Sequence, residues 1–258
     1  MAYQKTVLEN GITIVTEKMA SVRSVSLGLW VRCGARDEMA GEEGMSHFME
    51  HMLFKGTPTR NAIQISSAFD SIGAVLNAFT SHEVTCFYAS MIDKHFATGF
   101  EILADMLVNP LFKQEDIDLE QGVVVEEIAR SQDDPDDVVG DIFQSAMYPQ
   151  NNLGKPVLGK KETVESFDSA KMHEYHQKHY TSKNIVVAAA GNIDHALVVE
   201  LTQKLLANAP SGEMLQRPDC VKQNRKDLAI KNKDTEQAHL LVGFPGLVIL
   251  TTQNLHAE

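Results

Sequence analysis

The feature that most constrains the fold is a short helix that must present two histidines and a glutamate on one side. His47 and His51 lie four residues apart, and Glu50 follows His47 by three. On an α-helix, residues three or four positions apart share a face, so both imidazoles can reach one metal ion. Gly44 precedes this segment, and Gly56 is expected to end it. The rest of the chain must therefore bring a further ligand to this face.

The pattern H-x-x-E-H is the inverse of the H-E-x-x-H signature of zinc proteases. In such a site the glutamate between the histidines holds a water molecule on the metal. A lone pair of histidines at this spacing is more often a surface or core accident than a metal site, so the surrounding sequence has to decide.

A catalytic zinc usually has three protein ligands and one open position. The helix predicted over residues 115–131 offers three candidates for the third ligand: Glu120, Glu126 and Glu127. Glu120 and Glu127 are seven residues apart and share a face. Glu126 and Glu127 are separated by about 100° around the helix, so this pair cannot both face the metal. Helical geometry alone leaves the choice open.

Periodicity of the apolar residues predicts the other elements. Alternating runs predict strands at 6–8, 12–15, 25–31, 185–191 and 239–244, and a strand pair over 75–91. Helical patterns cover 62–72, 94–107, 115–131, 164–179 and 195–206. Strands grouped with runs of helices, without strict βαβ alternation, predict an α+β fold in which a mainly antiparallel sheet packs against helices. The acidic run 133–137 is expected to be a solvated loop.

Composition excludes several classes of protein. The net charge of −12 argues against a nucleic-acid partner, because phosphate binding needs a basic surface. No apolar run reaches about 18 residues, so no membrane span is expected. Cys33, Cys86 and Cys220 are odd in number and widely spaced, which is typical of reduced thiols. No signal or transit pattern opens the sequence, so the expected location is cytoplasmic.

The histidine motif is framed by segments that follow one another along nearly the whole chain. They are 8–11 (LENG), 34–38 (GARDE), 44–57 (GMSHFMEHMLFKGT), 77–80 (NAFT), 123–128 (VVVEEI), 153–159 (LGKPVLG), 180–184 (YTSKN), 191–193 (GNI) and 239–246 (HLLVGFPG). In these segments the chain resembles the pitrilysin/insulysin family of zinc metallopeptidases, the inverzincins. It is most similar to the branch that contains the mitochondrial processing peptidase β-subunit and its bacterial homologues.

The resemblance assigns roles to the candidate residues. It implies one Zn²⁺ per chain, held by His47, His51 and Glu127. Glu50 would be the catalytic general base, which activates the zinc-bound water and passes its proton to the leaving amine. Glu120 would be a carboxylate that orients a histidine ligand or tunes the water. The expected activity is hydrolysis of extended peptides or unfolded protein by a zinc metalloendopeptidase.

The resemblance also implies where a substrate lies and how the chain is divided. Asn77 and Ala78 would belong to an edge strand that binds an extended peptide by β-augmentation. Members of the family ordinarily contain two similar halves, and this chain covers the first. We therefore expect a zinc-binding catalytic domain over 1–206, a linker over 207–227 and the start of a second, truncated homologous domain over 228–258.

A half-length chain leaves alternatives open. The second half would come from a homo-oligomer or from a partner subunit, and without it the chain could be a metal-binding half-subunit with little activity. A non-catalytic scaffold is a third reading, although a scaffold has no need of a complete water-activating set. His173, His176 and His179 could form a second metal cluster by spacing. We expect exposed or capping histidines there instead, since no motif of the family includes them.

Overall fold

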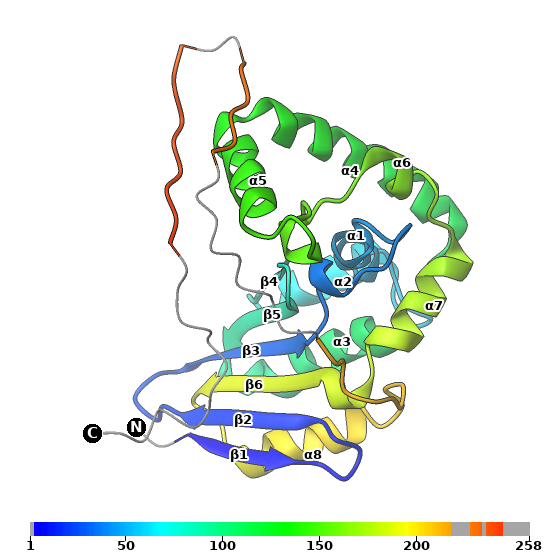
Figure 1. Cartoon of the computed structure of the whole chain (residues 1–258). Coiled ribbons are helices and arrows are strands. Elements are labelled where there is room, and N and C mark those ends of the chain that lie inside the picture. The colour runs from blue at the N-terminus through cyan, green and yellow to red at the C-terminus, as the bar shows by residue number, and fades with distance from the viewer. Residues whose placement is uncertain (1–2, 218–227, 234–235, 245–258) are drawn as a thin grey trace.

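A six-stranded sheet organises the molecule. The computed structural model describes residues 3–217, 228–233 and 236–244. The strand order is β1-β2-β6-β3-β5-β4, and every neighbouring pair is antiparallel except β2 with β6 (Figure 1). The strands are β1 (Gln4–Val7), β2 (Thr13–Lys18), β3 (Ser24–Val31), β4 (Val75–Thr80), β5 (Thr85–Ile92) and β6 (Ile185–Gly191). This arrangement confirms the α+β class with a mainly antiparallel sheet.

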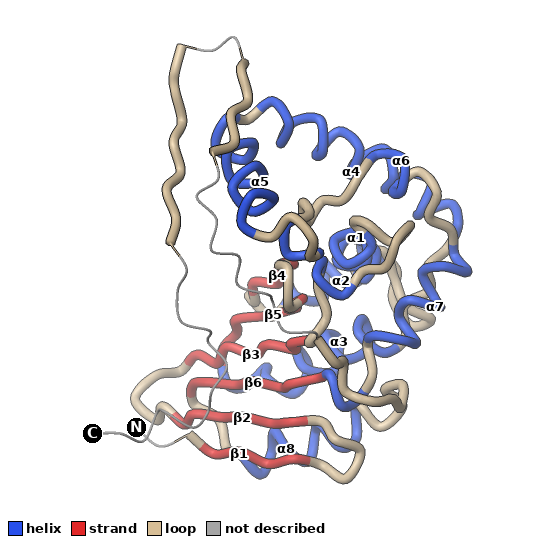
Figure 2. Tube along the Cα trace, viewed as in Figure 1, coloured by secondary structure: helices blue, strands red, loops and turns tan. Residues whose placement is uncertain are grey.

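Helices occupy two places around the sheet. Figure 2 shows α3 and α8 lying against the sheet, whereas α4 to α7 run around α1 at one end of it. The helices are α1 (Met45–Leu53), α2 (Ala62–Ser71), α3 (Phe96–Val108), α4 (Gln114–Asp133), α5 (Pro135–Met147), α6 (Lys161–Val164), α7 (Ser169–His179) and α8 (His195–Leu205). The helix that carries the histidine motif is therefore enclosed by other helices and by the β4 side of the sheet.

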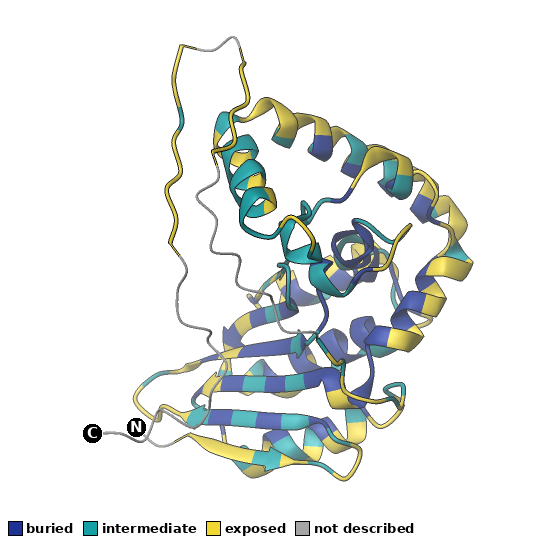
Figure 3. Ribbon diagram, in the orientation of Figure 1, coloured by how far each residue is buried: buried dark blue, intermediate teal, exposed yellow. Residues whose placement is uncertain are grey.

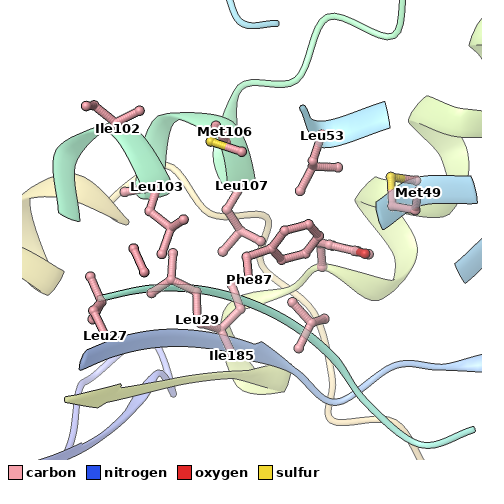
Figure 4. Packing of buried hydrophobic residues seen from close by; sticks show 14 of the residues in the cluster. Leu27, Leu29, Met49, Leu53, Phe87, Ile102, Leu103, Met106, Leu107 and Ile185 are labelled. Carbon is pink, nitrogen blue, oxygen red and sulfur yellow. The ribbon is translucent and has the colours of Figure 1, made fainter. Parts of the chain in front are cut away.

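The core lies between one face of the sheet and the helices. On β3, Leu27 and Leu29 alternate with residues of the opposite face, as the two-residue period of a strand requires. They pack with Phe87 of β5 and with Leu103 and Leu107 of α3 (Figure 4). Burial is concentrated in α1 and along this sheet face, while the outer sides of α4 and α7 are exposed (Figure 3). α1 is thus fixed from several sides.

In two segments the structure differs from the prediction. The helix predicted over 164–179 begins only at Ser169 in the structure: α6 ends at Val164, and Asp168 caps α7 by accepting a hydrogen bond from the Lys171 N–H at 2.8 Å. The acidic run 133–137 is not a loop. It contains the end of α4 and the start of α5, because Asp134 accepts from the Asp136 N–H and Pro135 occupies the first turn.

The strand predicted over 239–244 is wrong. These residues pair with no strand in the described part of the chain, and Leu240 and Phe244 are about four-fifths exposed. A strand needs a ladder partner to satisfy its backbone, and apolar alternation alone does not supply one. Residues 207–217 have no strand or helix, and 218–227 and 245–258 lie outside the described residues. The proposed division into two domains stays a prediction.

The fold offers no transmembrane helix: within the described residues, none is both long and apolar enough to cross a bilayer. Two of the three cysteines, Cys33 and Cys86, are buried free thiols. Cys220 lies outside the described residues.

Candidate metal centre

The N-terminus of α1 is held by a carboxylate from the preceding loop. Gly44 caps the helix with a φ of 95°, and a Cβ there would lie 2.6 Å from the Leu158 carbonyl oxygen, so both conformation and space require glycine. The buried Glu38 accepts from the Gly44 and Ser46 N–H groups at 2.9 and 2.8 Å. Burial raises the pKa of Glu38 to about 7, although these two N–H groups favour the carboxylate. The start of the helix is therefore fixed in position.

The apolar side of α1 turns the motif toward α4. Met45, Phe48, Met49 and Met52 are buried in the core. Because these positions occupy one side of the helix, the histidines face α4, which packs against α1.

Three side chains from α1 and α4 converge. The Nε2 atoms of His47 and His51 lie 3.7 and 3.6 Å from Oε2 of Glu127, and the ligand atoms of all three residues lie within 4.8 Å of one another. No other such group of three metal-ligating side chains occurs in residues 3–217, 228–233 and 236–244. Glu126 is exposed, as its position about 100° from Glu127 predicts.

The donor set fits zinc. Two imidazole nitrogens and one carboxylate oxygen are ordinary zinc ligands, at bond lengths of about 2.0–2.2 Å. Tetrahedral ligands at that length stand about 3.4 Å apart, close to the spacings between Glu127 and the two imidazoles. His47, His51 and Glu127 are therefore the residues that would hold the metal.

Glu120 orients one of the two histidines. Its Oε1 lies 2.8 Å from Nδ1 of His51, which leaves Nε2 of that ring facing Glu127. A carboxylate on the far nitrogen is the usual support of a metal-bound histidine. Lys55 contacts the other oxygen of Glu120. Burial opposes ionisation of Glu120, but His51 and Lys55 outweigh it and lower its pKa.

The two histidines differ in their surroundings. Burial lowers the pKa of His47 to about 4, so its ring is neutral and able to bind a metal at neutral pH. Nδ1 of His47 is buried and has no hydrogen-bond partner among the described residues. Burial also acts on His51, but its hydrogen bond to Glu120 and the nearby Glu127 and Glu50 outweigh burial and raise the pKa.

Glu50 is held by a residue of the neighbouring strand. The hydroxyl of Thr80, the last residue of β4, donates to Oε2 of Glu50 at 2.6 Å. Burial raises the pKa of Glu50, and the hydrogen bond from Thr80 opposes that shift. The carboxylate is thus fixed beside the two histidines while one oxygen remains available to a substrate or a water molecule.

β4 is the edge of the sheet next to this group. It pairs only with β5 in the described part of the chain. Asn77 is exposed and Ala78 is half-buried. The Ala78 N–H donates to the Asn77 side-chain oxygen at 2.8 Å instead of to β5, so it points to the free edge. The two residues predicted to bind substrate therefore lie on an open edge strand beside Glu50.

The second histidine group does not form a metal site. His173 is exposed, as expected, but His176 and His179 are buried, so the expectation of exposed or capping side chains is wrong for these two. They fill the core side of α7, where Nε2 of His176 donates to the Leu107 carbonyl oxygen, 2.8 Å away, and His179 packs on Tyr175. The carbonyl requires His176 to carry its proton on Nε2.

Sequence reasoning did not assign roles to Thr80 and Glu38. Alternation along 75–80 could have found Thr80, because it shares a face with Ala78 and that face points toward the helices. Glu38 belongs to the segment 34–38 that carries the family resemblance, but nothing in its spacing shows that it reaches α1 six residues later.

Comparison with known proteins identifies the family. Residues 13–161 match the family described as Insulinase (Peptidase family M16), and residues 166–257 match the Peptidase M16 inactive domain. An uncharacterized zinc protease of Streptomyces coelicolor is 41% identical, over 95% of this chain and 55% of that protein. The uncharacterized zinc protease YmxG of Bacillus subtilis is 39% identical, over 93% of this chain and 58% of that protein. The chain spans a little over half the length of these relatives.

Solved structures share the fold. A protease from Helicobacter pylori matches with a TM-score of 0.78 and 22% identity, over 86% of this chain and 54% of that one. The periplasmic protease PqqL from Escherichia coli matches with a TM-score of 0.77 and 23% identity, over 86% of this chain and 25% of that one. The sequence matches confirm the family resemblance, and this chain belongs to peptidase family M16, the insulinase family.

Proposed function

We propose that the chain is the catalytic half of a zinc metalloendopeptidase that hydrolyses extended peptides. The observation that carries the proposal is the convergence of His47, His51 and Glu127 within 4.8 Å, with the Glu50 carboxylate on the same helix face. The names of the relatives, zinc proteases, support the same metal.

Three residues of the chain have separate roles in the proposed reaction. When bound, zinc supplies Lewis-acid chemistry, which polarises the scissile carbonyl and makes water acidic enough to lose a proton near neutral pH. Glu50 takes the proton of the attacking water and later gives it to the leaving amine. Thr80 holds Oε2 of Glu50 so that the other oxygen can accept that proton. Glu120 keeps the His51 ring oriented.

The free edge of β4 is the proposed substrate site. An extended peptide laid along Asn77 and Ala78 would add a strand to the sheet and pair with the outward Ala78 N–H. In the structure the side-chain oxygen of Asn77 accepts a hydrogen bond from that N–H. A carbonyl oxygen of the peptide would displace the Asn77 oxygen. Substrates are then expected to be unfolded or extended segments, since a folded helix cannot offer such a carbonyl.

The remainder of the family architecture would come from outside this stretch of chain. Because the relatives are nearly twice as long, we propose that the second half, in the same chain or in a partner, closes the substrate site. A half-subunit that binds zinc but cleaves poorly without that partner is the second candidate function, and the same experiment separates the two.

The test is cleavage of a mixed quenched-peptide library by the purified chain, with zinc content measured on each sample. Glu50→Gln and a chelated sample are the matched controls. Cleavage that disappears in both supports the peptidase. A folded, zinc-loaded chain without cleavage supports the half-subunit, and a folded chain that binds no zinc contradicts both.

A further inference from the structure

The guanidinium of Arg217 joins two acidic residues that belong to different parts of the chain. Its Nε and Nη2 donate to the two carboxylate oxygens of Asp37 at 2.8 and 2.7 Å, and Nη2 also donates to the carbonyl oxygen of Glu83 at 2.5 Å. The side chains of Arg217 and Asp37 are only 11% and 5% exposed. A two-pronged contact of this kind is specific to arginine, and it is stronger when shielded from water.

The three residues lie in three segments that are far apart in the sequence. Asp37 ends the short 3-10 turn Ala35–Asp37 after β3, and Glu83 lies in the turn between β4 and β5. Arg217 lies beyond α8, in the connection toward the second half, and is the last described residue before 218–227. The connection therefore docks onto the β4–β5 turn.

That turn leads directly to the proposed base. The Ala35 and Arg36 N–H groups donate to the carbonyl oxygens of Ser81 and His82 at 3.2 and 2.8 Å. Ser81 follows Thr80, whose hydroxyl holds Glu50. Any displacement of the turn relative to Asp37 consequently moves Thr80 with respect to the Glu50 carboxylate.

Other contacts support the turn but do not replace Arg217. Arg36 pairs with the Glu83 carboxylate at 2.5 Å, and His82 lies 3.0 Å from the Lys155 carbonyl oxygen. Asp37 has no other cation within ion-pair distance among the described residues, and its other hydrogen bond comes from the Gly34 N–H. Without Arg217 a buried carboxylate would lose its countercharge, which is strongly unfavourable.

We propose that Arg217 is a positioning residue that clamps the β4–β5 turn and through it holds Thr80 against Glu50. The inference rests on the proposed role of Glu50 as the base. It means that Arg217, which lies beyond α8 in the sequence, helps to position the proposed base.

The first test measures hydrogen exchange of the segment that contains Thr80 to Thr85 in the zinc-loaded protein. Arg217→Gln is expected to speed its exchange at least about tenfold, with α3 and β6 unchanged. Glu213→Gln is the matched control, since it removes an ion pair from the same connection, where Glu213 is 89% exposed. Arg217→Lys keeps the charge beside Asp37 but loses the two-pronged contact, so it is expected to restore only part of the protection.

The second test follows peptide cleavage. Arg217→Gln is expected to lower kcat at least about tenfold and to change KM less than about threefold, while zinc content stays unchanged. Exchange that stays at the wild-type rate, or that rises equally in all strands, overturns the clamp. If Glu50→Gln cleaves as fast as the wild type, the proposed base is wrong, whereas the exchange result still decides whether Arg217 holds the turn.

Discussion

Helices α1 and α7 both carry histidines at helical spacing, yet they face different partners. In α1, His47 and His51 point at carboxylates of α4. In α7, His176 and His179 point at aromatic rings and a backbone carbonyl. Both pairs are largely buried, so burial does not distinguish them. The difference shows that the facing element, and not the histidine spacing, makes a metal site.

Replacing the proposed base should have the largest effect. Glu50→Gln removes the proton acceptor but leaves His47, His51 and Glu127 in place. We expect cleavage to fall roughly 10²–10⁴-fold, with zinc content unchanged. Peptide turnover and metal analysis on the same sample check this, and loss of zinc in the variant would mean that Glu50 belongs to the ligand set.

Removal of a carboxylate of α4 should weaken metal binding by the histidines of α1, which would then resemble the histidines of α7. Glu127→Gln should lower zinc affinity by more than the roughly 10–100-fold that loss of a supporting partner costs, and Glu120→Gln should fall within that range. Competition with a chromophoric chelator measures both.

Two controls belong with this prediction. Glu126→Gln and His176→Gln should leave zinc affinity unchanged, because Glu126 is exposed and α7 faces no carboxylate pair. Normal binding by Glu127→Gln together with loss of binding by Glu120→Gln would assign the third ligand to Glu120 instead.

Acid should act on the α7 histidines through stability. Burial, the largest cause, lowers the pKa of both His176 and His179 to about 4. The unfolded chain takes up protons first, near pH 6.5, so the free energy of unfolding falls as the pH drops from about 6.5 to about 4, by about 3 kcal/mol for each histidine.

The variant His179→Phe isolates one of these contributions. Urea unfolding of the metal-free protein at pH 7 and pH 4.5 should show a smaller loss than in the wild type. His47, whose pKa is also lowered, is present in both proteins and cancels in the difference. Equal losses in the two proteins would show that His179 does not stay neutral in the folded state.

The smallest effect is expected at a helix cap. Asp168→Ala removes the side chain that accepts from the Lys171 N–H and should lower the free energy of unfolding by about 1 kcal/mol. Zinc affinity should not change, since α7 carries no ligand. A drop in zinc affinity would mean that α7 supports α1 through the Ser46–Tyr175 hydrogen bond, and would weaken the distinction between the two helices.

The sequence predicts what depends on local pattern. Periodicity placed β3, β5, β6, α3, α4 and α8 to within a few residues, and helix geometry showed that Glu126 and Glu127 cannot both face the metal. Choosing Glu127 over Glu120 needed the family resemblance, because both lie on one face of α4. The cytoplasmic location stays a prediction.

Contacts between distant segments could not be predicted in this way. Glu38 reaches α1 across a loop, Thr80 meets Glu50 from a different element, and Arg217 meets Asp37 from beyond α8. Such pairs depend on the packing of whole elements. The prediction of a strand over 239–244 was wrong for the opposite reason. Its local pattern is right for a strand, but it pairs with no strand in the described residues.

The place of β6 in the sheet has a consequence for how this protein is made. β6 pairs with β2 in parallel and with β3 in antiparallel fashion. The sheet is therefore continuous only after Thr13 has paired with Val186, which is synthesised much later. A ribosome has already produced α1, α4 and all the proposed ligands by then. Pairings so distant in sequence form slowly, and until they form two sheet fragments expose unpaired edges. A shortened chain that stops at residue 161, where the first family match ends, would keep every zinc ligand and lack the strand that joins its two sheet fragments.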